Sequence, residues 1–324
     1  MNRNVLALCV GAVLSCSTAV HAATLDFSQP TLNKGLPSAS GVVVTDNQIF
    51  AVGDDSPWLY QLDNDFKIKQ KQMIKHYPVR DNGRIVKKVK PDFEALDNIE
   101  VNGRDSFVML GSGSKEDVRE WAFVISHDGL VRTERSLKAL YKDLRTAAGY
   151  NADQEINIEG LATSEDSAFV INRGNGGSNV IFDIPLEGFQ AYLAGQTDQL
   201  KGIKAYHVTL PVVKGFEAGL SGAEYWDEAD SLLLTASIEA TGDAYNDGEI
   251  LGSFVGKVKL VDLDASKTLD LTDNLIPLLK DNKRVITKVE SIAIQKQDSH
   301  SVKGVLASDN DDGTSEFFSF SFKK

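Results

Sequence analysis

The segments NIEGLA, residues 157–162, and KVESIAI, residues 288–294, share the feature that decides the fold. In each segment a glutamate precedes a small residue and then an aliphatic residue. A carboxylate directly in front of a strand-like apolar run is unfavourable in an ordinary core, because a buried charge without a partner is strongly destabilising. The recurrence of this order therefore indicates a repeated structural unit in which the glutamate lies outside the ordinary apolar core.

The same order, with serine admitted in place of glutamate, occurs at five positions. They are Ser40, Glu94, Glu159, Ser221 and Glu290, separated by 54, 65, 62 and 69 residues. Each position opens a strand-like run, and two further strand-like runs follow it, as in QIFAVGDD at 48–55 and WLYQLD at 58–63. Three or four strands in a unit of nearly fixed length predict a β-propeller.

The number of repeats predicts an all-β, five-bladed propeller that forms one domain over residues 23–324. The last repeat ends after its third strand, EFFSFSF at 316–322, and TLDFSQ at 24–29 is a strand outside the repeats. We expect this N-terminal strand to complete the last blade and close the ring. Short helices are expected at 136–147 and 271–280. A pair of sandwiches and a six-bladed ring remain as alternatives.

The first 22 residues have the features of an export signal. The basic residue Arg3, the apolar run VLALCVGAVL at 5–14 and the small-residue sequence VHA predict a signal peptide cleaved after Ala22. The alternative is a lipoprotein signal that would anchor the chain at Cys16. Because both cysteines of the chain lie in this leader, no disulfide is expected in the mature protein. We expect a periplasmic or secreted protein.

The charge of the chain limits its partners. The 34 basic and 46 acidic residues give a formal net charge of −12, which becomes −13 without the leader, since Arg3 is its only charged residue. This balance argues against nucleic acids and anionic lipid surfaces as partners and favours cations. No stretch is long and apolar enough to span a membrane. The sequence leaves the oligomeric state open.

Residues at equivalent starts of the innermost strands form a ring around the axis of a propeller. Here that ring would hold three carboxylates, from Glu94, Glu159 and Glu290, and the hydroxyls of Ser40 and Ser221. Carboxylates that converge in a narrow channel raise each other's pKa unless a cation joins them. Calcium takes six to eight oxygen ligands, whereas zinc prefers the His and Cys that the ring lacks. We therefore expect an axial Ca²⁺. The alternatives are a water-filled acidic channel and a calcium that only holds the blades together.

A second set of polar residues follows the second strand of each repeat, on the same face as the ring. The expected catalytic residues are Asp54, Asp55, Arg173 and Glu239. The expected substrate-binding residues are Ser112, Lys115, Asn172 and Asp309, with Asp311 close by. A basic side chain beside a bound cation suits a phosphoryl group, and an acid can orient or deprotonate water. The alternative is that these residues only form turns, because Asp, Asn and Ser are common in β-turns.

A serine-triad hydrolase is not expected. The sequence contains no G-x-S-x-G motif, and the four histidines after the leader lie away from the repeat positions, at 76, 127, 207 and 300.

Several stretches, in order along nearly the whole mature chain, resemble the calcium-activated nucleotidases, an apyrase family of five-bladed propellers. They are SGVVVTDNQIFAVGDDSPWLYQL, FEAL, GSGSKEDVREW, NIEGLA with INRG, GLSGAEY with LLLTASIE, and VESIAI. The resemblance implies calcium ligands at the five ring positions and substrate-facing roles for Asp54 or Asp55, Arg173 and Glu239. The chain departs from that family in having one arginine where the nucleotidases have a pair.

The signatures GDDSP, NIEG and DAYNDG also resemble a group of bacterial proteins of unknown function. The calcium-dependent phytase and lactonase propellers are similar in architecture alone. The function predicted from these features is a calcium-dependent phosphoester or phosphoanhydride hydrolase that acts on a small phosphorylated molecule or another anionic ligand. The alternative is a non-catalytic propeller that binds a ligand or a protein and uses calcium structurally. A lactonase-like or other ester hydrolase is the third hypothesis.

Overall fold

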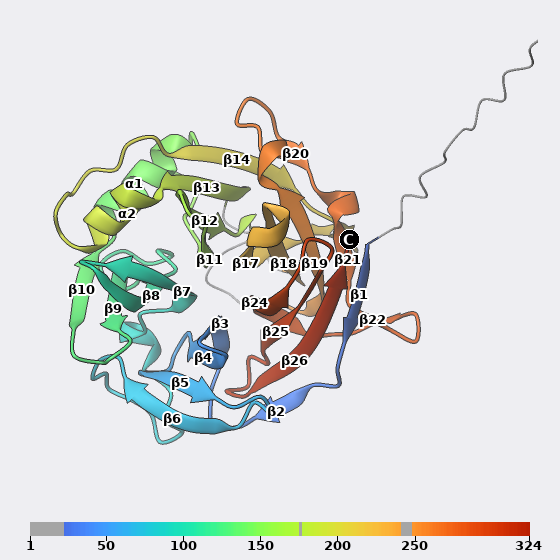
Figure 1. Cartoon of the computed structure of the whole chain (residues 1–324), viewed down its shortest axis with the longest axis horizontal. Helices are drawn as coiled ribbons and strands as arrows, with labels where there is room; N and C mark the ends of the chain where they lie inside the picture. The colour runs from blue at the N-terminus through green and yellow to red at the C-terminus, as the bar shows by residue number, and fades with distance from the viewer. Residues whose placement is uncertain (1–22, 175–176, 241–247) are drawn as a thin grey trace, which may run out of the picture.

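The computed structural model describes residues 23–174, 177–240 and 248–324. The predicted leader and residues 243–247 of the DAYNDG signature lie outside this part. Five mainly antiparallel sheets surround a central axis, as Figure 1 shows, and form the predicted five-bladed β-propeller. The sandwich pair and the six-bladed ring are thereby excluded.

In blades 1 to 4 the strands run outward from the axis in chain order. Blade 1 consists of β3 (Ala39–Thr45), β4 (Gln48–Gly53), β5 (Trp58–Leu62) and β6 (Ile68–Met73). Blade 2 consists of β7 (Phe93–Val101), β8 (Arg104–Gly111), β9 (Trp121–Ser126) and β10 (Arg132–Ser136). Blade 3 consists of β11 (Ile158–Thr163), β12 (Ser167–Asn172), β13 (Asn179–Pro185), β14 (Lys204–Thr209) and the added parallel strand β20 (Leu269–Asp270). Blade 4 consists of β17 (Gly219–Trp226), β18 (Ser231–Glu239), β19 (Ile250–Lys259) and β21 (Leu275–Pro277).

Blade 5 is built from both ends of the described chain. Its inner strands are β24 (Lys288–Gln297), β25 (Ser301–Asp309) and β26 (Ser315–Lys323). The N-terminal strand β1 (Thr24–Phe27) pairs antiparallel with β26, and β2 (Thr31–Asn33) pairs with the same strand. The predicted closure of the ring is therefore confirmed.

One of the two expected helices is present. The helix α1 (Lys138–Ala147) agrees with the prediction, but the helix expected at 271–280 is wrong. That stretch forms η5 (Thr272–Asn274), β21 and β22 (Leu279–Lys280), because β21 supplies the outer strand of blade 4 by pairing with β19. Proline is tolerated on such an edge strand and disfavoured inside a helix. A second helix, α2 (Leu186–Leu193), was not predicted.

The connections carry short elements. They are η1 (Lys87–Val89), η3 (Asp227–Ala229), η4 (Leu260–Asp262), and the hairpins β15–β16 (Val212–Val213, Phe216–Glu217) and β22–β23, in which β23 is Lys283–Arg284.

The apolar side chains of the described residues form five clusters, one between each pair of neighbouring blades. Leu140 and Tyr141 of α1 and Phe189 of α2 extend the cluster between blades 2 and 3. Trp226, which is fully buried, fills the cluster between blades 4 and 5. The core is thus distributed around the ring and leaves the axis to polar residues.

Candidate functional site

The five ring positions share one backbone feature that the sequence did not reveal. In every inner strand the register with the second strand shifts across the ring residue, between Ala39/Gly41, Phe93/Ala95, Ile158/Gly160, Leu220/Gly222 and Val289/Ser291. Each ring residue is therefore the extra residue of a β-bulge. A bulge bends its strand and re-aims a side chain, so the carboxylate leaves the core while the strand that follows stays buried.

The small residue after each ring position is explained by the approach of the inner strands. These strands contact one another in a closed ring, β3 to β7, β11, β17, β24 and back to β3. A Cβ atom at Gly222 would lie 2.9 Å from the carbonyl oxygen of Glu290, and one at Gly160 would lie 3.1 Å from the backbone nitrogen of Ala223. A larger side chain at either glycine would push neighbouring blades apart.

The two ring serines connect neighbouring blades. Ser40 donates a hydrogen bond to the carbonyl oxygen of Phe93, the residue before Glu94. Ser221 donates one of 2.6 Å to the carbonyl oxygen of Val289, the residue before Glu290. Each hydroxyl thus holds the strand that presents the next ring glutamate, and its oxygen keeps lone pairs.

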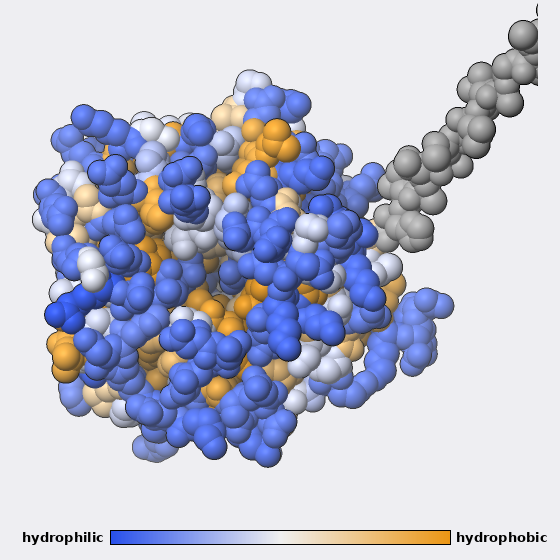
Figure 2. All heavy atoms as spheres, viewed as in Figure 1, coloured by the Kyte–Doolittle hydropathy of each residue, from blue (hydrophilic) through white to orange (hydrophobic). Residues whose placement is uncertain are grey.

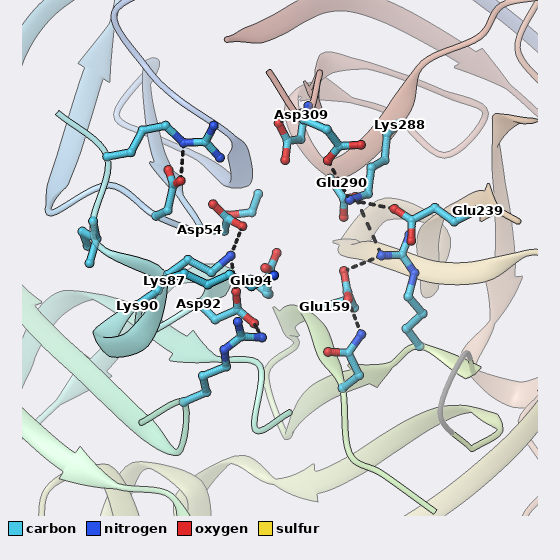
Figure 3. A pocket seen from close by; sticks show the side chains of 18 of the residues that line it. Asp54, Lys87, Lys90, Asp92, Glu94, Glu159, Glu239, Lys288, Glu290 and Asp309 are labelled. Carbon is cyan, nitrogen blue, oxygen red and sulfur yellow. Dashed lines mark hydrogen bonds and ion pairs between the residues drawn. The ribbon is translucent and has the colours of Figure 1, made fainter. Parts of the chain in front are cut away.

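The bulges open onto a cavity of about 210 Å³ on the axis. Figure 2 shows a molecular face made mainly of hydrophilic side chains, with apolar side chains visible in the seams between them. In Figure 3 the carboxylates of Glu94, Glu159 and Glu290 point toward a common space. One oxygen from each of these three glutamates lies within 4.8 Å of the others. Of the five ring residues, Ser221 does not line the cavity.

Two basic side chains enter the ring. Nη1 of Arg173 lies 3.2 Å from Oε2 of Glu159 and 3.8 Å from Oε1 of Glu290, and Nζ of Lys288 lies 3.3 Å from the same Glu290 oxygen. Arg173 is 5% exposed and also donates to the hydroxyl of Ser237. Although burial opposes it, the neighbouring glutamates raise the pKa of Arg173, so the guanidinium stays charged.

Glu94 differs from the other two ring glutamates. Among the described residues it has no ion pair and no hydrogen bond. Burial, with the charges of Asp92 and Glu159, raises the pKa of Glu94 well above its ordinary value. Neither carboxylate oxygen of Glu290 accepts a hydrogen bond within the described part of the chain. The ring therefore presents buried oxygen atoms that lack donors, which is the environment a hard cation requires.

The charge of the cavity agrees with such a cation. Its described lining contains nine carboxylates and seven basic side chains, a formal charge of −2 that one divalent ion would balance. The donors are all oxygen atoms, so the residues fit calcium or magnesium better than zinc. A second group of oxygens within 4.8 Å, from Asp54, Asp92 and Glu94, lies next to the first. There the ammonium of Lys90 pairs with Asp54 and, at 2.6 Å, with Asp92.

The expected catalytic residues all line the cavity, and each has a counter-charge. Asp54 pairs with Lys90, and Asp55 pairs with Arg84. Burial and the neighbouring Asp54 raise the pKa of Asp55 to about 6, and its Oδ1 atom has no hydrogen-bond partner in the described residues.

Glu239 lies 2.7 Å from Nζ of Lys288. Burial would raise the pKa of Glu239, but Arg173 and Lys288 together lower it, so this glutamate stays ionised. Asp309 also lines the cavity, and burial with the charge of Asp54 raises its pKa well above the ordinary value. Asp311 lies at 3.3 Å from Lys288 on the same side.

Three of the expected substrate-binding residues do not line the cavity. Ser112 is buried and donates to Asp92, and Lys115 is half-buried, with its ammonium 3.4 Å from the carbonyl oxygen of Lys88. Asn172 accepts from the backbone nitrogen of Asn157 and donates to the carbonyl oxygen of Ser178. Ser112 and Asn172 thus hydrogen-bond to the loops around the cavity.

The sequence analysis missed several residues of the site, but a signal for three of them was present. Asp92, Asn157 and Lys288 each stand two positions before a ring glutamate and line the cavity. Asn157 donates to Glu159 at 2.6 Å, and Asp92 pairs with Arg119 at 2.6 Å. Because all three have the same spacing from a ring glutamate, these polar positions could have been predicted from the repeat. Arg84, Lys90 and Arg119 offered no such pattern.

The fold and the site define a five-bladed propeller whose axial pocket is lined by carboxylates and by basic side chains. Residues 35–322 match a family described as a family of unknown function, DUF6929, and the chain belongs to this family. No curated protein matches the sequence. Within the described residues, no helix has the length and apolar character needed to cross a membrane.

Three solved structures are similar to this chain at low identity. Glutaminyl cyclase of Myxococcus xanthus is 11% identical with a TM-score of 0.48, covering 92% of this chain and 96% of that one. Virginiamycin B lyase of Staphylococcus aureus is 11% identical with a TM-score of 0.41, covering 93% and 99%. The Bacillus subtilis arabinanase Arb43A is 12% identical with a TM-score of 0.43, covering 89% and 95%. These similarities carry no information about the activity of this chain.

Proposed function

We propose that this protein is an exported, calcium-binding propeller that hydrolyses a phosphoester or phosphoanhydride bond in a small anionic substrate. The observation that carries the proposal is the position of Glu94, a ring carboxylate with no ion pair and no hydrogen bond among the described residues, in a cavity that also contains basic side chains. The predicted signal peptide supports export to the periplasm or to the outside of the cell. The resemblance to the nucleotidases agrees with this function but stays a prediction.

Glu94, Glu159 and Glu290 would hold the calcium ion, with Ser40 beside them on the cavity wall. When bound, calcium supplies electrostatic polarisation of a phosphoryl oxygen. Arg173 lies beside Glu159, and Lys288 lies beside Glu239 and Glu290, so these basic groups offset part of the negative charge around the ion.

Asp55 is the best candidate for the general base. Its pKa of about 6 lies close to neutral pH, and Arg84 fixes its Oδ2 atom and leaves Oδ1 without a partner in the described residues. The water oxygen bonds to phosphorus while one water proton passes to Oδ1. The bond from phosphorus to the leaving oxygen breaks, and its electron pair stays on that oxygen. Asp309, whose pKa is raised well above its ordinary value by burial, can supply the proton that the leaving oxygen takes up.

The test is phosphate release by the purified mature protein, in calcium and in excess chelator. The panel contains nucleoside diphosphates, nucleoside triphosphates and inositol hexakisphosphate. We expect calcium-dependent release that Asp55→Asn reduces by about 100-fold or more, since a general base contributes on that order. Asp65→Asn, in an exposed turn, is the matched control. An Asp55→Asn variant that keeps the full rate would remove Asp55 from this role.

A second function is favoured by the enclosure of Arg173 and by the two serine bridges between blades. In this alternative the protein binds a ligand or another protein, and calcium only stabilises the ring. It predicts a higher melting temperature in calcium and no phosphate release from any member of the panel. The lactonase-like hypothesis is checked by adding a set of lactones to the same assay.

A further inference from the structure

The segment RDNGRIVKKVK, residues 80–90, is a basic run in an acidic protein. It contains five basic residues and one acidic residue, whereas the whole chain has a net charge of −12. The basic residues are Arg80, Arg84, Lys87, Lys88 and Lys90. This run lies in the connection between β6 and β7, and four of its basic side chains line the axial cavity. We call this segment the basic strap.

The basic strap is held in place by its backbone. A turn is closed by a hydrogen bond of 2.8 Å from the backbone nitrogen of Arg80 to the carbonyl oxygen of Arg84. Val79 and Ile85 form an antiparallel β-bridge. The nitrogen of Ile85 donates to the carbonyl oxygen of Asp55 at 2.7 Å, which ties the strap to blade 1. On the other side a Cβ at Gly313, in blade 5, would lie 3.2 Å from the Arg84 side chain. The strap therefore has a defined position at the cavity.

The basic residues of the strap have two different environments. Arg84 and Lys90 are partly buried and pair with the carboxylates of Asp55 and Asp54. Arg80 is exposed at the edge of the cavity, and among the described residues its side chain has no hydrogen bond and no ion pair. Lys87 lines the cavity nearby, and Figure 3 shows it beside Lys90. The charge of Arg80 is thus available to a ligand.

We propose that the basic strap binds a second anionic group of the ligand, so that the site selects phosphoanhydride chains such as pyrophosphate and triphosphate over single phosphate groups. This inference rests on the proposed function, because it assumes that the first phosphate lies at the axial calcium. Every further phosphate needs its own cationic partner, since the carboxylates of the cavity repel it. The planar guanidinium of Arg80 can donate two hydrogen bonds to one phosphate, which an ammonium cannot match.

The experiment compares anions by titration calorimetry with free calcium held constant. We expect pyrophosphate and triphosphate to bind the wild type at least about 10-fold tighter than orthophosphate, a difference of about 1.4 kcal/mol. The double variant Arg80→Ala/Lys87→Ala should lose this preference and keep its orthophosphate affinity within about twofold. Lys88→Ala, in η1 but outside the cavity lining, is the matched control and should keep the preference. Arg80→Lys should keep part of it.

Calcium binding to the wild type and to the double variant is measured separately by competition with a chromophoric chelator. Calcium binding without any pyrophosphate preference would overturn the role of the strap and leave the proposed metal site standing. Absence of calcium binding would overturn the proposed metal site itself. Tricarballylate that binds as tightly as triphosphate would overturn the assignment to phosphate chains, because the strap would then accept any polyanion.

Discussion

The hydroxyl of Ser221 donates a 2.6 Å hydrogen bond to the carbonyl oxygen of Val289, one residue before Glu290 in the next blade. Ser40 has the same relationship to Phe93, one residue before Glu94. Two ring serines therefore hold the strands that carry two ring glutamates. Assembly of the cavity and adhesion of the blades depend on the same contacts.

Ser221→Ala should destabilise the protein by about 1–3 kcal/mol, because it leaves the buried carbonyl of Val289 without a donor. The measurement is urea unfolding, in calcium and in chelator. Ser266→Ala, in an exposed turn, is the control and should change stability by less than about 0.5 kcal/mol. An effect of Ser221→Ala no larger than that of the control would show that the blades do not depend on this bridge.

Gly222→Ala should also lower stability, by about 1–3 kcal/mol, as overpacking in a dense region does. The new methyl group would lie 2.7 Å from Oγ1 of Thr235 and 2.9 Å from the carbonyl oxygen of Glu290. In contrast, Gly188→Ala in α2 should be neutral or stabilise by up to about 1 kcal/mol, since the nearest atom is 3.7 Å away and alanine favours helix. Thermal unfolding of both variants distinguishes crowding from a general sensitivity to added methyl groups.

Glu94→Gln should abolish the stabilisation by calcium without weakening the calcium-free protein. Glu94 has no hydrogen bond or ion pair to lose among the described residues, and removal of its charge relieves repulsion from Asp92 and Glu159. For the wild type, calcium at 100 times its Kd should add about 2.7 kcal/mol. Melting temperatures with calcium and with chelator give both quantities. A Glu94→Gln protein that still responds to calcium like the wild type would exclude Glu94 as a ligand.

Arg173→Met should have opposite effects on folding and on calcium binding. Without Arg173, Glu159 and Glu290 lose a cation that lies 3.2 and 3.8 Å away, so the calcium-free protein should lose about 3–5 kcal/mol of stability. Calcium should bind more tightly, because the guanidinium no longer competes for these carboxylates. Arg104→Met, at an exposed ion pair, is the control and should leave calcium affinity unchanged. Weaker calcium binding to Arg173→Met would show that Arg173 supports the metal site.

Asp97 should make stability depend on pH. Burial raises its pKa to about 7 from the ordinary 3.8, although Thr163 and the backbone nitrogen of Asn98 donate to it. The carboxylate of Glu224 also faces this group, and its own pKa is raised by burial and by Asp97. Because the folded state holds the proton more tightly than the unfolded state, wild-type stability should fall as pH rises from about 4 to about 7.

The substitution Asp97→Asn replaces the titratable carboxyl group with an amide. Relative to the wild type, the variant should therefore become more stable as the pH rises over the same interval. One pKa unit corresponds to about 1.4 kcal/mol, so the difference should reach at most about 4 kcal/mol above pH 7. Urea unfolding of both proteins at pH 4, 6 and 8 measures it. A constant difference across these values would mean that Asp97 does not titrate in this range.

The repeat made the ring predictable, because Ser40, Glu94, Glu159, Ser221 and Glu290 carry the same local sequence around a fixed axis. The bulges at these positions were not predictable, since a bulge is defined by the register between two strands. The basic residues that pair with the carboxylates of the cavity were not predictable either. Arg84, Lys90 and Arg119 reach the cavity from connections outside the repeat.

The helix predicted at 271–280 is absent for a similar reason. The local sequence around Leu275 and Ile276 suggested a helix. These residues instead pair with Gly256 and Val255 of β19, and this long-range pairing decides their conformation. In α2, Gly188 and the aromatic residues weaken the local helical signal, and burial of Phe189 and Tyr192 against blades 2 and 3 compensates for it. Local patterns identified the blades, whereas the outer edges depended on contacts between distant residues.

The pairing of β1 with β26 sets an order of assembly. During synthesis the first strand emerges with no partner and has to wait for Ser315–Lys323, nearly the whole length of the chain later. Blades 1 to 4 can form one after another, but the circle is completed only at the end, when the two ends of the described chain meet. Force applied to β1 or β26 should therefore separate the fifth blade before any other blade.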